Sequence, residues 1–131
     1  MIYATNSEAM GMGLLDRLRA ILRPGSENFL DFTDMLAKKY GVEKFLLATT
    51  EGLPITGNFE SIEELSAELP ELKKQLSHLE PCDDYLLATP NYVYIVTRLS
   101  SDVIMLTRGT RVLTWEEIEE LKQVTREELK I

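Results

Sequence analysis

Hydrophobic side chains recur every three or four positions in four stretches of the chain, which is the spacing of one face of an α-helix. The first stretch ends at Pro24-Gly25, because proline lacks an N–H and glycine accepts the left-handed exit from a helix. The second ends at Gly41, and the last begins at Thr114, which forms a capping-box pattern with Glu117. The apolar faces of these three helices are Leu14, Leu15, Leu18, Ile21 and Leu22; Phe29, Phe32, Leu36 and Tyr40; and Trp115, Ile118, Leu121, Val124 (or Thr125) and Leu129.

Between the helices, short apolar runs bounded by turn residues predict five strands. The gaps between consecutive strands are so short that they require antiparallel hairpins. Several runs are apolar almost throughout, which indicates a sheet with helices on both faces. We therefore predict a single-domain α/β/α sandwich, profilin-like, with a five-stranded antiparallel sheet in the order helix-β-β-helix-β-β-β-helix and an additional N-terminal helix. The predicted strands are Phe45–Thr49, Leu53–Thr56, Tyr85–Thr89, Tyr92–Leu99 and Val103–Arg108.

The remaining helical stretch has the sharpest pattern, with apolar residues alternately three and four positions apart. This is the a/d seam of a heptad, which is narrower than the stripe of a helix that only covers a core. Part of the seam must cover the sheet, but its form favours self-association with a second helix. Pro70 lies inside the stretch and should kink or split the helix, unless it opens a new helix at its first position. The seam consists of Ile62, Leu65, Leu69, Leu72, Leu76 and Leu79.

Composition narrows the class of protein. The 131 residues fit one domain, and a net charge of −8 argues against nucleic acid as a partner. The acidity is local, because residues 60–84 hold eight acidic side chains against two lysines. No apolar run is long enough to span a bilayer, and nothing resembles a signal peptide, so we expect a cytoplasmic protein without a transmembrane segment.

Residues that carry catalysis are scarce. The single histidine, His78, lies beside the heptad seam, and the single cysteine, Cys82, lies among acidic residues that disfavour its thiolate. The adjacent glutamate pairs are typical of solvated helix faces, and the glycines mark turns and do not form a phosphate-binding loop. We predict that the chain is not an enzyme and has no catalytic, cofactor-binding or metal-binding residues.

Residues 1–25 form a separate part of the predicted organisation. Their leucines lie opposite Arg17, Arg19 and Arg23, so this amphipathic helix could lie on a membrane surface. The helix is short and has no lysine-rich face, which favours packing on the domain or on a partner. We therefore divide the chain into an N-terminal extension, residues 1–25, and a main domain, residues 26–131; the sequence leaves the role of the extension open.

The order of elements over residues 26–131 resembles the roadblock / dynein light chain family. The match includes the hairpin Phe45–Ile55, with its Thr-Glu-Gly-Leu-Pro-Ile turn, followed by a helix, a three-stranded meander and a final helix. Family members pair through the central helix and the strand after it, which joins two sheets into one. Here the resemblance implies an interface formed by Ile62, Leu65, Leu69, Leu72, Leu76, Leu79, Tyr85 and Leu87. The chain departs from the family in its leading segment, its central proline and its acidity.

The resemblance also implies a function. Members bind or regulate Ras-like small GTPases, or act as scaffolds in larger assemblies, and bind no nucleotide themselves. The sequence therefore favours a non-catalytic homodimeric regulatory module that binds a small GTPase or a scaffold protein. The alternative is a sensory domain of the PAS or profilin-like kind, which an internal pocket lined by Tyr85, Tyr92 and Tyr94 would favour. Which partner is bound, and whether regulation activates or inhibits, lies beyond the sequence.

Overall fold

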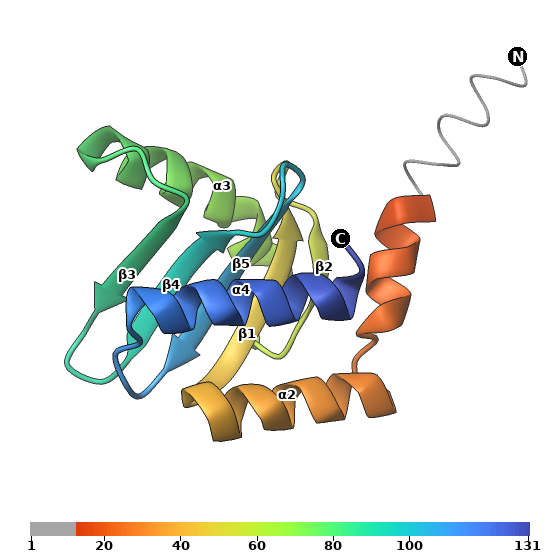
Figure 1. The fold of residues 1–131 in the computed structure, drawn as a ribbon. Helices are drawn as coiled ribbons and strands as arrows, with labels where there is room; N and C mark the ends of the chain where they lie inside the picture. The colour runs from red at the N-terminus through yellow and green to blue at the C-terminus, as the bar shows by residue number, and fades with distance from the viewer. Residues whose placement is uncertain (1–12) are drawn as a thin grey trace, which may run out of the picture.

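The computed structural model describes residues 13–131, in which helices enclose a five-stranded sheet. Residues 13–21 are helical and precede the remaining elements. The predicted α/β/α sandwich and its order of elements are confirmed (Figure 1). The elements are α2 (Glu27–Tyr40), β1 (Val42–Thr49), β2 (Pro54–Gly57), α3 (Ile62–Leu79), β3 (Asp84–Ala88), β4 (Val93–Arg98), β5 (Val103–Gly109) and α4 (Trp115–Leu129).

The strands are antiparallel to their neighbours and lie in the order β2-β1-β5-β4-β3. The predicted hairpin, β1 with β2, and the predicted meander of β3, β4 and β5 are thereby joined through the central pair β1 and β5. β1 begins at Val42, earlier than predicted, because β5 extends to Gly109 and pairs with Val42 across a bulge. Sequence periodicity alone could not show this pairing, because Val42 and Gly109 are far apart in the chain.

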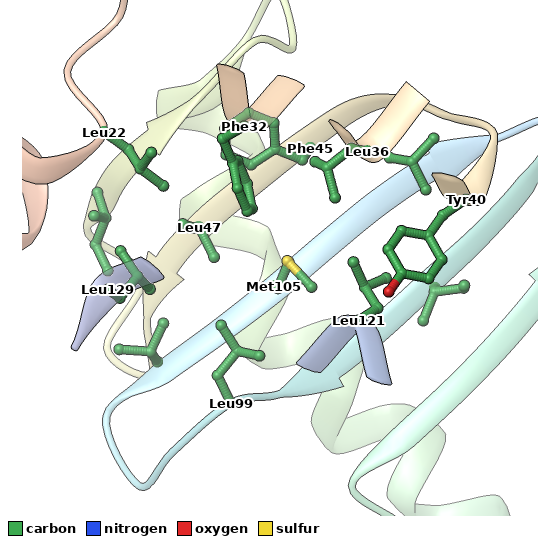
Figure 2. Packing of buried hydrophobic residues seen from close by; sticks show 14 of the residues in the cluster. Leu22, Phe32, Leu36, Tyr40, Phe45, Leu47, Leu99, Met105, Leu121 and Leu129 are labelled. Carbon is green, nitrogen blue, oxygen red and sulfur yellow. The ribbon is translucent and has the colours of Figure 1, made fainter. Parts of the chain in front are cut away.

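The larger core lies between the sheet and α2 with α4 (Figure 2). Phe45 of β1 lies at its centre, with its ring 5.2 Å from that of Phe32 and 5.6 Å from that of Phe29. Met105 of β5 and Leu121 of α4 are fully buried in the same cluster. Burial of such side chains stabilises the fold by about 1.5 to 3 kcal/mol each before entropy is counted.

A smaller core lies on the opposite face, beneath α3. Leu46, Ile104 and Val96 point to this face, and Leu69 of α3 packs among them with 2% of its surface exposed. Ile62 and Leu65, also on α3, pack at the margin of the same cluster. The first half of the heptad seam therefore covers the sheet of its own chain.

Of the outcomes that the sequence leaves open for Pro70, a split does not occur, because α3 forms one helix from Ile62 to Leu79. Pro70 has no N–H, so the carbonyl of Ser66 lacks its usual partner four residues on. Contacts on both sides of the proline offset this loss. Leu69 is buried against the sheet, and the ammonium group of Lys73 donates to the carbonyl of Cys82 (3.3 Å).

The helical residues 13–21 pack against the larger core. Leu18 and Leu22 are buried there together with Leu129 of α4. The guanidinium of Arg19 donates twice to the carbonyl of Pro54 (3.0 and 2.8 Å), and the hydroxyl of Thr56 donates to the carbonyl of Leu22 (2.6 Å). Of the two positions that the sequence favours for this helix, on the domain or on a partner, the structure shows packing on the domain. Residues 1–12 of the predicted extension lie outside the described residues.

Candidate protein interface

The two edges of the sheet differ in how they are protected. The edge strand β2 is short and begins with Pro54, which has no N–H. The carbonyl of Pro54 already accepts two hydrogen bonds from Arg19. Such features block the addition of another strand. No comparable contact from residues 13–22 reaches β3, at the opposite edge of the sheet.

The backbone of β3 presents a regular row of hydrogen-bonding groups to this open edge. The N–H of Thr89 donates to the carbonyl of Tyr92 (2.8 Å), and the N–H of Arg98 donates to the carbonyl of Asp83 (3.0 Å). In an antiparallel pair these bonds alternate along the strand, so odd-numbered residues of β3 bond to β4. The backbone groups of Asp84, Leu86 and Ala88 therefore point away from β4 and can accept a further strand.

The second half of the heptad seam lies near this edge without covering the sheet. Leu72 is 37% exposed and Leu79 is 85% exposed, while Leu76 is half-buried. Tyr85 and Leu87 pair with Val96 and Tyr94 of β4, respectively, and so share the α3 face of the sheet. An uncovered apolar surface thus runs from α3 to the open edge.

The structure separates the eight residues that the sequence assigns to an interface. Leu69 belongs to the chain's own core, and Ile62 and Leu65 lie at its margin. Leu72, Leu76, Leu79, Tyr85 and Leu87 keep exposed surface and lie on the two elements that the resemblance names. We call these five residues the apolar surface.

Aromatic residues and an arginine lie beside the apolar surface, where the sequence had assigned Tyr92 and Tyr94 only to the pocket of the sensory alternative. The Arg108 guanidinium lies 4.4 Å from the centre of the Tyr92 ring and 5.6 Å from that of Phe59. Tyr92 in turn contacts Tyr94 edge-on, with ring centres 6.3 Å apart. A cation over an aromatic ring is stabilising, and it keeps both groups in place. The alternation along β4 and β5 was the signal that could have placed Tyr94 and Arg108 on this face.

Hydrogen bonds fix the end of α3 to the start of β3. The hydroxyl of Tyr85 donates to the carbonyl of Glu80 (2.5 Å) and accepts from the N–H of Cys82 (3.0 Å). The ammonium group of Lys73 lies 5.9 Å from the centre of the Tyr85 ring. The two elements of the apolar surface are therefore held together within one chain.

The environment of Cys82 agrees with the prediction that its thiolate is disfavoured. The thiol lies 3.2 Å from a carboxylate oxygen of Glu80. This hydrogen bond raises the pKa of the Cys82 thiol, with smaller contributions from burial and from the charges of neighbouring acids. A thiol in this state is a weak nucleophile.

An ion pair fixes β3 to α4 on the other face of the sheet. The ammonium group of Lys122 lies 3.0 Å from a carboxylate oxygen of Asp84 and 3.1 Å from one of Glu119. The hydroxyl of Thr97 donates to the same carboxylate of Asp84. Burial alone would lower the pKa of Lys122, but the hydrogen bonds to Asp84 and Glu119 outweigh it, so the pKa is raised.

Within residues 13–131, no group of three or more His, Cys, Asp or Glu side chains could hold a metal ion. No helix in that part of the chain has the length and hydrophobicity needed to cross a membrane.

Comparison with known sequences gives one informative match. No family model matches the chain. An uncharacterized protein of Archaeoglobus fulgidus is 33% identical over 91 residues, which make up 70% of this chain and 54% of that protein. The chain thus spans about half the length of the curated relative that it matches.

Comparison with solved structures identifies the fold. Myxococcus xanthus MglB matches with a TM-score of 0.60 at 12% identity, over 88% of this chain and 86% of that one. The gliding protein MglB of Thermus thermophilus has a TM-score of 0.60 at 9% identity, over 88% and 87%. A Roadblock/LC7 domain of Streptomyces avermitilis has a TM-score of 0.55 at 12% identity, over 75% and 93%. The α/β/α sandwich, the order of strands in the sheet and the similarity to these structures together show that the chain has the Roadblock/LC7 fold.

Proposed function

We propose that the chain is a non-catalytic module of the roadblock family that forms a homodimer and binds a Ras-like small GTPase or a scaffold protein. The observation that carries the proposal is the pairing of an open β3 edge with the apolar surface beside it. In this proposal residues 26–131 form the family domain, and residues 1–25 are an extension, of which residues 13–22 contribute to the core.

The geometry supports a two-fold pairing. A second copy of β3 would bond to the free backbone groups of Asp84, Leu86 and Ala88 and so continue the sheet. The two copies of α3 would then lie side by side across the sheet and cover Leu72, Leu76 and Leu79. Such a contact is isologous, since each chain contributes the same surface. A solved form of MglB with a tetrameric arrangement, similar in fold with a TM-score of 0.61 at 9% identity over 79% of this chain and 85% of that one, agrees with association in this fold.

The oligomeric state tests the homodimer. Leu72→Glu with Leu76→Glu places two carboxylates in the proposed contact, and the charges cannot be buried without a partner. Sedimentation should show the unsubstituted chain at twice its 14.9 kDa mass and the variant at 14.9 kDa. Leu79→Glu alone, at a position that is 85% exposed and cannot disturb the core, should weaken the dimer at least tenfold.

A matched control carries two glutamates on other surfaces. Leu30 and Val112 are 57% and 62% exposed, on α2 and in the loop before α4. Leu30→Glu with Val112→Glu should leave the dimer intact. An unsubstituted chain that sediments as a monomer at micromolar concentration would contradict the homodimer.

The GTPase partner rests on the resemblance in sequence pattern and on the shared fold. Purified Ras-like small GTPases of the source organism, loaded with GDP or with a non-hydrolysable GTP analogue, should bind the immobilised chain, with one nucleotide state preferred. If none binds in either state, the regulatory function is wrong. Failure to bind would favour the sensory alternative. The positions of two tyrosines that should line its pocket count against it, because Tyr94 packs on the smaller core and Tyr92 lies against Arg108.

A further inference from the structure

A second surface, rich in cations, lies along the flank of α3 that faces away from Leu72 and Leu79. Successive residues of a helix are about 100° apart, so Lys74 and Ser77 lie on the side of α3 roughly opposite these leucines. They form a cleft with the end of β1 and with the β4–β5 hairpin. Its polar lining is Lys73, Lys74 and Arg98 with the hydroxyl residues Thr50, Ser77 and Ser101.

The charge of this cleft departs from that of the molecule. The chain has 22 acidic and 14 basic side chains, yet three cations and no carboxylate line the cleft. One of these cations forms an ion pair with an acid: the Arg98 guanidinium lies 4.0 Å from the carboxylate of Asp83, and the two side chains are 46% and 65% exposed. An exposed pair at this distance is weak, so Arg98 remains available to another anion.

The walls of the cleft are held by backbone hydrogen bonds. The N–H of Thr50 donates to the carbonyl of Asp102 (3.0 Å), which joins the end of β1 to the β4–β5 hairpin. Arg98 donates through Nε to the carbonyl of Ser100 (3.1 Å), and Lys73 donates to the carbonyl of Cys82. Lys73 and Arg98 therefore keep further N–H groups for a ligand while their side chains are already oriented, which lowers the entropy lost on binding.

We propose that this cleft binds an extended acidic segment of a partner protein. Its cations come from two different elements, α3 and β4, so they suit carboxylates spaced along a peptide. A single phosphate group is instead bound where several N–H groups converge, as at the N-terminus of a helix.

This inference goes beyond the proposed function, because it concerns a different flank of α3 and a different ligand. The probe is a fluorescently labelled hexaglutamate peptide, with labelled hexaglutamine as the neutral counterpart, in fluorescence polarisation at 50 mM and 150 mM salt. The chain should bind hexaglutamate and not hexaglutamine, with weaker binding at the higher salt concentration because the charges are screened. Lys74→Glu with Arg98→Glu should reduce the affinity for hexaglutamate at least tenfold.

A control variant separates the cleft from net charge. Arg17 and Arg23 are exposed on the N-terminal segment, so Arg17→Glu with Arg23→Glu makes the same change in net charge at another surface. This variant should bind hexaglutamate nearly as well as the unsubstituted chain. Equal losses in both variants, or competition by inorganic phosphate at lower concentration than by unlabelled hexaglutamate, would overturn the proposal. Sedimentation of each variant shows whether the dimer is intact, so failure of the cleft and failure of the homodimer are distinguishable.

Discussion

Lys122 carries its charge in a nearly buried position on α4, where 5% of its side chain is exposed. It bonds to Asp84, which is the first residue of the open edge strand. A buried ion pair adds little stability as a pair, but removing one partner leaves the other charge without compensation. The main effect of this ion pair is therefore to position β3 against α4.

Lys122→Met should lower the free energy of unfolding by about 2 to 3 kcal/mol, because the carboxylate of Asp84 is left partly buried without its cation. Chemical denaturation measures this loss. Adding Asp84→Asn to Lys122→Met should restore part of it, since the second change removes the uncompensated charge. A double variant as unstable as the sum of the two single variants would show that the two side chains do not interact.

Glu117 is held in its charged form at the start of α4. The Arg111 guanidinium, 2.8 Å away, and the backbone N–H of Thr114 lower the pKa of the Glu117 carboxyl from 4.5 to about 2. Since the folded pKa is depressed, the stabilising contribution is present above the unfolded pKa and is lost as pH falls from about 4.5 to about 2.

Titration of Glu117 followed by nuclear magnetic resonance should give a midpoint near pH 2. In Arg111→Gln the largest cause of the lowered pKa is removed, so the midpoint should rise toward 4.5 while the capping hydrogen bonds to Thr114 keep it below that value. An unchanged midpoint would mean that Arg111 does not determine the pKa.

At the scale of elements, the turn between β1 and β2 lies directly against α3. Gly52 has a φ of 95°, and a Cβ at this position would lie 3.3 Å from the Cα of Ala67 and from the carbonyl oxygen of Ser66. This is the same carbonyl that Pro70 deprives of its helical partner. The turn therefore approaches α3 at the position where Pro70 leaves a helical carbonyl without its usual hydrogen bond.

Gly52→Ala should destabilise the fold by about 2 kcal/mol, because the positive φ and the close contact with α3 both oppose a side chain. Gly25 is a matched control, since its φ is 84° but nothing lies within 4 Å of an added Cβ. Thermal unfolding should therefore show a smaller loss for Gly25→Ala. Equal losses would mean that the contact with α3 contributes nothing.

At the scale of the whole molecule, the protected β2 edge and the open β3 edge determine how a second chain can join the sheet. Residues 13–22 close the first edge through Arg19 and also complete the larger core. Any extension of the sheet must then occur at β3. The direction of assembly thus follows from where the N-terminal segment packs.

Ala88→Pro tests this assembly through the backbone. Ala88 is exposed, and its N–H points away from β4, so proline removes a hydrogen bond to a second chain and none within its own hairpin. Sedimentation should show that the dissociation constant of the dimer rises at least tenfold. The circular dichroism spectrum of the chain should be unchanged. Thr89→Pro is the contrasting variant, because it removes the bond to Tyr92 and should destabilise the hairpin itself. A dimer that is unaffected by Ala88→Pro would contradict pairing at this edge.

The sequence by itself determined the elements of this protein and their order. Helix periodicity, the Thr114 cap and the apolar strand runs are local properties, and the bounds of α3 coincide with the first and last residues of its seam, Ile62 and Leu79. Only the tertiary structure decided which leucines are free. Leu69 and Leu72 both belong to the heptad seam, yet Leu69 is buried by β1 and β5 and Leu72 is exposed, because α3 extends past the part of the sheet that it covers. The spacing of apolar residues predicts which face of a helix is apolar. The order of strands that are distant in the sequence determines whether that face packs on the sheet or stays exposed.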